Sequence, residues 1–306
     1  MKIQNILGCD MTIQQAFDNF ILSRRLADLS VKTVKDYTEF VTPFVEFLGA
    51  NRAIETITET DINRYIAELL DRPLSKASRS TYIRHIKIFL RWLEETYEIH
   101  INAKHIRVPK TPKRTVKIYS DDEITQIFMA VQTDTEWITL RNKCIIALMY
   151  DSGLRQSEVC TLRRRNVSFT DNRLVVYGKG NKERTVPLGR LTARFIRLYY
   201  ESCPYTSEFV FVNRHGEKLT CNAVKLMVTK LANKLDFELS SHKLRHNFAT
   251  NYCLDQYEQK GQIDIFRLMV LMGHEEVETT RRYLHLANEI IASKETISHL
   301  DKLKII

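Results

Sequence analysis

Six polar side chains in otherwise apolar stretches of the second half of the chain could together perform phosphodiester transfer. They lie in the motifs GLRQSEV, GKGNKER, SHKLRHNFAT and LMGHEEVETTRRYLH, and they are Arg155, Lys179, His242, Arg245, His274 and Tyr283. This reaction requires cations on the nonbridging oxygens, a nucleophile, and groups that move protons. Arginines can clamp a phosphate, histidines and a lysine can transfer protons, and a tyrosine can attack. Such a set needs no metal and no nucleotide cofactor.

Each of these residues also has a plainer interpretation when it is taken singly. Arg155 can pair with Glu158 on its own helix, and Lys179 can be a solvated residue at the tip of a turn. Tyr283 can be an ordinary core tyrosine on an amphipathic helix. The chemical hypothesis therefore rests on the set and not on any single member.

A zinc site is the main alternative for the histidines. His242 and His246 are four residues apart, so they could share a metal ion, or His246 could simply pack. The H-E-x-x-H pattern of zinc peptidases needs a glutamate as general base, and here that position is Lys243. A structural zinc on His242, His246, His274 and Cys253 is conceivable, but no strong ligand spacing supports it.

The region that must position these residues, from about 117 to 306, is predicted to combine helices with a small antiparallel sheet. Alternating residues predict strands over 173–177 and 183–187, joined by a hairpin turn at 178–181, and a further short β segment over 209–212. Ser120 and Glu123 form a capping-box pattern. Helices are expected over 120–131, 137–151, 221–235, 241–255, 263–272 and 277–286.

The first region, from about 11 to 105, is predicted to be helical throughout. Helices are expected over 12–26, 30–48, 58–70 and 75–97, and Pro43 is expected to kink or split the second one. The fourth helix has an apolar face and a neighbouring basic edge, with five basic and no acidic residues between Leu74 and Leu93. Such a helix fits a major groove of DNA, and an ordinary solvated face is the alternative.

Charge and composition narrow the class of protein further. The chain has 306 residues and a net charge of +9, which predicts about two domains and favours a polyanionic partner. Residues 101–120 carry six basic and no acidic side chains, so segment 106–117 is predicted to be a basic linker. No apolar run is long enough for a membrane helix, and no signal peptide is evident. The six scattered cysteines favour reduced thiols in the cytoplasm.

Taken together and in their order, the four motifs resemble the tyrosine recombinase family, or phage-type integrases, and specifically its short Xer-like members. The resemblance implies that Arg155 and Arg245 clamp the phosphate, that Lys179 is the general acid with Lys182 as a competitor, and that Tyr283 forms a 3′-phosphotyrosine bond. His242 and His274 match the two family histidines, the first being the better candidate for proton transfer.

The resemblance also implies an architecture and a set of partners. A SAM-like helical core-binding domain (11–105) and a catalytic domain (118–306) would form a C-shaped clamp on double-stranded DNA core sites. A homotetramer, with or without a second recombinase, would exchange strands through a Holliday junction, in mobile-element integration and excision or in Xer-like dimer resolution. The C-terminal tail, with Ile290, Ile297, Leu300, Leu303 and Ile306, would dock on the next protomer or pack in cis.

The predicted DNA contacts lie on the fourth helix and on the linker. They are Lys76, Arg79, Arg84, Lys87, Arg91, Lys110, Lys113 and Arg114. Two other functions remain as alternatives at this point. A DNA-binding accessory protein would have a degenerate site, and a type IB topoisomerase would relax supercoils without a partner site.

Overall fold

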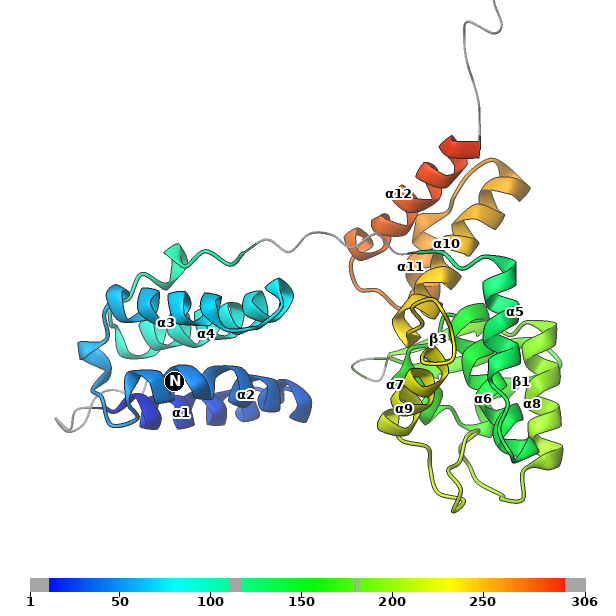
Figure 1. Ribbon diagram of the computed structural model, residues 1–306, viewed down its shortest axis with the longest axis horizontal. Coiled ribbons are helices and arrows are strands. Elements are labelled where there is room, and N and C mark those ends of the chain that lie inside the picture. Colours follow the sequence, from blue (N-terminus) through cyan, green and yellow to red (C-terminus); the bar gives the residue numbers. More distant parts are fainter. Residues whose placement is uncertain (1–10, 110–116, 179, 181, 295–306) are drawn as a thin grey trace, which may run out of the picture. The chain divides into compact units, whose positions relative to one another are not determined.

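The computed structural model describes residues 11–109, 117–178, 180 and 182–294, and it separates the chain into the compact units Met1–Arg114 and Thr115–Ile306. Each unit is built around its own apolar core, and we call them the helical unit and the C-terminal unit. The predicted fold class is confirmed, because the chain is mainly helical with one small antiparallel sheet (Figure 1). The predicted domain limits stay predictions.

The helical unit contains α1 (Ile13–Leu26), α2 (Val31–Leu48), α3 (Glu59–Asp71) and α4 (Lys76–Tyr97), all within two residues of the predicted ranges. A hydroxyl side chain caps each N-terminus by accepting a backbone N–H bond, and these caps are Thr12, Ser30, Thr58 and Ser75. Short 3-10 turns, Ile54–Thr56 and Ala103–His105, complete the unit. The caps and the apolar spacing together explain why the sequence revealed these helices.

Of the two outcomes expected at Pro43, the split is wrong, because α2 continues through this residue from Val31 to Leu48, and the kink stays a prediction. Pro43 removes one hydrogen bond of the helix, but Val41, Phe44 and Val45 are buried on either side of it. Burial of these neighbours therefore outweighs the local preference, since a packed apolar face contributes more than one backbone bond.

The C-terminal unit holds eight helices among the residues that the structure describes. They are α5 (Asp121–Ala130), α6 (Glu136–Asp151), α7 (Gln156–Thr161), α8 (Arg190–Ser202), α9 (Cys221–Ala232), α10 (Ser241–Lys260), α11 (Ile265–Met272) and α12 (Val277–Lys294). The α8 helix was missed, and α10 and α12 extend further than predicted. In α8 the buried residues Thr192, Ala193, Ile196 and Tyr199 follow helical spacing, so the signal was present in the sequence.

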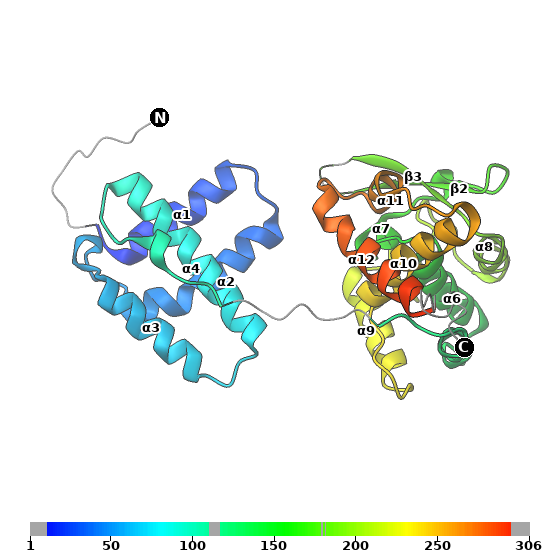
Figure 2. The same ribbon diagram turned by 90° about the horizontal axis from the view of Figure 1, so that it is seen from above.

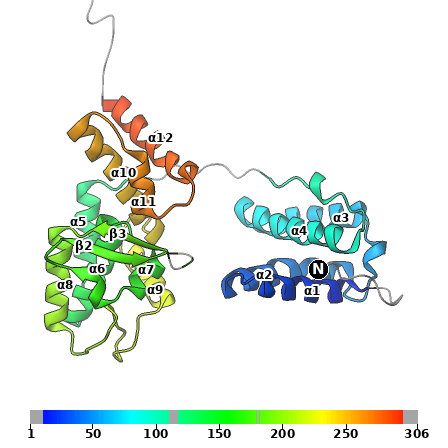
Figure 3. The same cartoon turned by 180° about the vertical axis from the view of Figure 1, so that it is seen from behind.

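The sheet consists of β1 (Val167–Ser168), β2 (Arg173–Tyr177) and β3 (Glu183–Pro187), paired antiparallel in that order. Figure 3 shows β2 beside β3. The predicted strands 173–177 and 183–187 are confirmed, with Leu174 opposite Val186 and Val176 opposite Arg184. The predicted β segment at 209–212 is wrong, because Phe209 and Val212 form only isolated bridges. A two-residue β1 takes the edge of the sheet instead.

A separate small apolar cluster joins α10, α11 and α12, which lie together in Figure 2. Phe248 and Cys253 on α10 and Leu268 and Met272 on α11 pack there. Tyr283 on α12 belongs to the same cluster, so its ring is fixed by the packing of three helices. The sequence left Tyr283 as either a nucleophile or a core tyrosine, and the structure places its ring in an apolar cluster.

Candidate active site

The buried carboxylate of Glu158 lies where residues of several of these motifs meet. Arg155 precedes α7, and its backbone N–H donates to Oε2 of Glu158 at 2.7 Å while its guanidinium donates to Oε1 at 2.9 Å. Arg184 of β3 donates to both oxygens of the same carboxylate, at 2.7 and 2.8 Å. Burial would raise the pKa of Glu158, but the bonds and charge of Arg184 outweigh it and the pKa is lowered. Glu158 is therefore an anion that orients two guanidinium groups.

Arg245 adds a third guanidinium group to this cluster. It is on α10, only 6% exposed, and its Nη1 lies 3.9 Å from Oε2 of Glu158. Burial, and then the charge of Arg155, lowers its pKa to about 9, so it still carries its positive charge at neutral pH. Three arginines around one carboxylate leave an excess of positive charge, which suits a phosphate.

Backbone carbonyls at the end of α11 hold the same three arginines. Arg184 donates to the carbonyl of Leu271 at 2.8 Å, Arg245 donates to that of Met272, and Arg155 donates to that of Gly273 at 2.9 Å. The last carbonyls of a helix lack partners within the helix and carry its negative dipole end. Successive residues of one helix end thus fix three cations that come from three other elements.

Gly153 forms the turn that joins α6 to the motif of Arg155. Its φ is +63°, in the region that favours glycine, and a Cβ there would come within 2.3 Å of the ring of Phe248. Its carbonyl accepts a hydrogen bond from Nη1 of Arg245. The glycine is therefore required by its conformation and by the close packing, and it positions one of the arginines.

Tyr283 lies between two histidine rings. Its phenol oxygen is 2.6 Å from Nδ1 of His246, and the ring of His274 stacks against it with centroids 6.2 Å apart. Burial raises the pKa of Tyr283, while the charges of Arg245, Arg282 and Arg155 act in the opposite direction. The phenol is therefore close to the positive cluster and is protonated at neutral pH.

The two histidines of the predicted set occupy different environments. Nδ1 of His274 is 2.9 Å from the hydroxyl of Thr280, and burial followed by the charge of Arg245 lowers the pKa of His274 to about 4. His242, at the start of α10, is exposed. Arg155, Arg245, His274 and Tyr283 are thus brought together, and the imidazole that meets the phenol is His246, which the sequence left as either a zinc ligand or a packing residue.

The predicted general acid, Lys179, lies outside the described residues. Its competitor Lys182 is exposed, and its ammonium donates to Glu275 at 2.8 Å. Both lysines lie in the sequence between β2 and β3, and β3 carries Arg184. The choice between the two lysines therefore stays a prediction.

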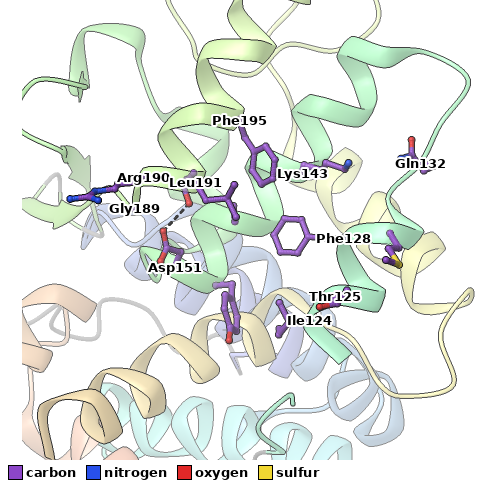
Figure 4. A pocket seen from close by; sticks show the side chains of 14 residues that line it. Ile124, Thr125, Phe128, Gln132, Lys143, Asp151, Gly189, Arg190, Leu191 and Phe195 are labelled. Atoms are coloured by element: carbon purple, nitrogen blue, oxygen red, sulfur yellow. Dashed lines mark hydrogen bonds between the residues drawn. The ribbon is translucent and has the colours of Figure 1, made fainter. Parts of the chain in front are cut away.

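A cavity of about 560 Å³ opens beside the arginine cluster. Arg155, Arg184 and Gly273 line it together with Lys182 and His274. A second cavity, of about 610 Å³, lies between α5, α6 and α8 and is lined mainly by apolar side chains such as Phe128 and Phe195 (Figure 4). Charged side chains of both signs line the first cavity, among them Arg155, Arg184 and Lys182 with Glu183 and Glu275, whereas neither Arg245 nor Tyr283 lines either of the two cavities.

The predicted DNA contacts on α4 differ in how they are engaged. Lys76, Arg84 and Arg91 are exposed. Arg79 is half-buried and donates to the carbonyl of Arg72, and Lys87 donates to the carbonyls of Lys104 at 3.0 Å and Ile106 at 2.7 Å. The predicted contacts of the linker, Lys110, Lys113 and Arg114, lie outside the described residues. Their role in DNA binding, like that of the α4 residues, stays a prediction.

Two features, a membrane-spanning helix and a cluster of metal ligands, are absent from the described ranges. No helix there is long and apolar enough to cross a membrane. No group of three or more histidine, cysteine or acidic side chains in the same ranges could hold a metal ion. His242, His246, His274 and Cys253, which the sequence offered as conceivable zinc ligands, do not gather into such a group there.

Family models match both units of the chain. Residues 117–289 match the phage integrase family, and residues 17–100 match the N-terminal SAM-like domain of phage integrases. The first match covers more than half of the chain and includes every residue of the arginine cluster. The chain therefore belongs to the phage integrase family.

Relatives and solved structures agree with this assignment. Tyrosine recombinase XerC of Staphylococcus aureus is 30% identical over 287 residues, which are 90% of this chain and 93% of the relative. XerH recombinase bound to a palindromic difH substrate matches with a TM-score of 0.71 at 19% identity, over 93% of this chain and 84% of that one. A lambda integrase dimer bound to a core site also scores 0.71, at 20% identity, over 89% of this chain and 95% of that one. The chain is a tyrosine recombinase, an enzyme of site-specific DNA recombination.

Sequence reasoning missed three contributors to this site, Glu158 as its centre, Arg184, and His246. Glu158 was considered only as a partner of Arg155, and Arg184 lies 26 residues from it along the chain. A signal was available for Arg184, since it occupies an inward position of a predicted alternating strand, where an arginine is costly unless it is paired. His246 gave no comparable signal, because spacing alone does not show which of two histidines meets a tyrosine 37 residues away.

Proposed function

We propose that Tyr283 is the nucleophile that cleaves DNA in this recombinase, and that Arg155 and Arg245 hold the scissile phosphate. The phenol oxygen attacks phosphorus and forms a bond to the 3′ phosphate, while the bond from phosphorus to the 5′ oxygen breaks. Lys179 donates the proton that the 5′ oxygen takes, with Lys182 as the competing donor. Attack by the freed 5′ hydroxyl of another strand reverses these steps and rejoins the DNA.

The observation that carries this proposal is the position of Tyr283 beside a preorganised positive cluster. Arg155 and Arg245 are both held by backbone carbonyls and by the carboxylate of Glu158, so little rearrangement is needed when a phosphate binds. Fixed cations aimed at developing charge are usually the largest single contribution to this kind of catalysis. Their charges also favour the phenolate form of Tyr283 as it attacks.

The partners follow from the relatives and belong to the same proposal. A relative has been solved on a palindromic difH substrate and another as a dimer on a core site. For this chain we propose double-stranded core sites of DNA as substrate, four copies in the synaptic complex, and action in the cytoplasm. His242 and His274 steady the phosphate or transfer protons in this scheme.

A Tyr283→Phe substitution tests the nucleophile directly. We expect the variant to form no covalent complex with a nicked suicide substrate, because only the attacking oxygen is removed. Its affinity for DNA in a gel-shift assay should equal that of the wild type. A variant that still crosslinks to the nicked substrate would rule out Tyr283 as the nucleophile.

A further inference from the structure

Among the residues that the structure describes, the hydrogen bond between His246 and Tyr283 is the polar contact that involves the reacting oxygen itself. Nδ1 of His246 is 2.6 Å from the phenol oxygen, and the ring centroids are 5.4 Å apart. His246 follows Arg245 directly on α10, so the residue that would touch the phosphate and the residue that touches the nucleophile are neighbours in the chain. This distance is within the hydrogen-bond reach from which a general base can take a proton.

Burial determines which of the two groups donates the hydrogen. Burial, and then the charges of Arg282 and His242, lowers the pKa of His246 to about 4, so its ring is neutral at neutral pH. A neutral imidazole has one nitrogen that accepts. Burial raises the pKa of Tyr283, so the phenol keeps its hydrogen. A protonated phenol facing an uncharged imidazole can donate to Nδ1, with the ring hydrogen then on Nε2.

We propose that His246 is a catalytic residue that takes the phenolic proton as Tyr283 attacks, an inference that rests on the proposed role of Tyr283. One bond forms between the phenol oxygen and phosphorus, and the proton moves from that oxygen to Nδ1 of His246. The imidazolium returns the proton to the phenol oxygen when the DNA is rejoined. The proton for the leaving 5′ oxygen comes from the lysine and not from His246.

The other two imidazoles are less well placed for this transfer. His242 is exposed and stands one turn before His246 on α10. His274 meets the phenol ring face to face, with an interplanar angle of 16°, and its Nδ1 faces the hydroxyl of Thr280. A ring that stacks on the tyrosine supports it without directing a nitrogen at its oxygen. The geometry therefore favours His246 as the proton acceptor.

The surrounding charges make the transfer depend on bound DNA. Arg245 and Arg282 disfavour an imidazolium at His246 in the free protein. A phosphodiester that binds to the arginines brings a negative charge, which offsets these cations and favours protonation of the imidazole. The free enzyme thus holds a neutral pair, and the substrate itself supplies the charge that promotes the proton transfer.

A His246→Asn substitution tests the role, because an amide oxygen can accept the phenol's hydrogen bond but cannot take its proton. General-base catalysis typically contributes about 10²–10⁴-fold, so we expect the single-turnover cleavage rate to fall by at least about 10²-fold with unchanged DNA affinity. A substrate with sulfur at the 5′ leaving position needs no proton there, so it should not restore this variant, although it should restore a variant of the lysine acid. His215→Asn is the matched control, because His215 is exposed and lies outside the site, and this variant should cleave the oxygen and sulfur substrates at wild-type rates.

NMR provides a second test that does not require a variant of His246. The imidazole nitrogens of His246 are followed by NMR in the wild type and in Tyr283→Phe, where we expect an unprotonated Nδ1 whose resonance moves when the phenol hydrogen is lost. A protonated Nδ1, near-wild-type cleavage by His246→Asn, or its rescue by the sulfur substrate would each overturn the role of His246. Crosslinking by Tyr283→Phe would instead overturn the proposed nucleophile, so the two failures are distinguishable.

Discussion

The two units of the chain differ in what they bury. In the described part of the helical unit, Ser80 is the one buried polar residue, and the core is built from apolar and aromatic side chains such as Phe20, Phe44 and Phe89. The C-terminal unit buries the charged residues Arg141, Glu158, Arg184 and Arg245. Both units pack an apolar core, so the difference lies in the polar and charged side chains that the C-terminal unit buries, of which Glu158, Arg184 and Arg245 form one cluster.

The buried charges of the C-terminal unit lower its free energy of unfolding relative to an apolar core. Removing charges from water costs several kcal/mol for each ion, and a buried ion pair rarely recovers more than that cost. Apolar side chains of similar volume, as in the core of the helical unit, would fill the same space with a higher free energy of unfolding. Among the buried arginines, Arg245 holds a fixed positive charge close to Tyr283, which no apolar packing can supply.

The sharpest test of this comparison is Arg245→Ala. By analogy with loss of a donor to a developing anion, we expect about 2.7–4 kcal/mol less transition-state stabilisation, a fall of roughly 10²–10³-fold in cleavage rate. The carbonyls of Gly153 and Met272 also lose their partner, so the melting temperature should fall. Single-turnover cleavage and thermal unfolding measure the two effects. A stable variant with full activity would contradict the role of the buried cluster.

Glu158→Gln should act mainly on stability. Loss of the central anion leaves Arg184 buried without a counter-charge, which typically costs about 3–5 kcal/mol of unfolding free energy. The matched control is Glu208→Gln, because Glu208 pairs with Arg163 on the surface, where such pairs are worth about 0–1 kcal/mol. Urea unfolding of both variants at neutral pH gives the comparison, and equal costs would show that burial of the pair is irrelevant.

The same pair gives a pH dependence with a definite sign. The pKa of Glu158 in the folded protein is below its ordinary value of 4.5, so the carboxylate's contribution is complete above that value and is lost as pH falls through the folded pKa. The unfolding free energy of the wild type should therefore decline in acid more steeply than that of Glu158→Gln. Parallel profiles for the two proteins would contradict this assignment.

The smallest effects are expected on the surface of the helical unit. Arg84→Ala and Arg91→Ala should each weaken DNA binding and reduce the slope of log affinity against log salt by about 0.9, with stability unchanged within about 0.5 kcal/mol. Lys87→Ala is the contrasting variant, because Lys87 holds the carbonyls of Lys104 and Ile106 and its loss should destabilise the unit. A salt slope that is unchanged in the two arginine variants would remove this face of α4 from the DNA interface.

Local patterns predicted most of the secondary structure because they depend on neighbouring residues. The strands that contain Leu174 and Val186 could be placed by alternation, and the starts of α2, α3 and α5 by their caps. Pro43 shows the limit of this reasoning, because its local cost is outweighed by the burial of Phe44 and other neighbours on α2. A rule that considers one residue at a time cannot compare the local cost of a proline with the free energy gained by burying its neighbours.

Only some members of the site were predictable from the sequence, and the contacts between its members were not. Motif order indicated Arg155, Arg245 and Tyr283, whereas the pairing of Glu158 with Arg184 depends on how a helix and a strand pack in space. The same holds for His246, because only the packing of α10 against α12 brings it to Tyr283. The sequence thus indicates which side chains can take part in the reaction, but only the three-dimensional structure shows which of them are in contact.

The end of α11 has a consequence for any attempt to move this chemistry into another protein. The carbonyls of Leu271, Met272 and Gly273 each hold a different arginine, although none of these carbonyls belongs to a side chain. A designer who grafted only the signature side chains onto a new scaffold would leave all three guanidinium groups without their backbone anchors. The smallest transferable part of this enzyme therefore includes a helix terminus whose contribution no substitution scan would detect.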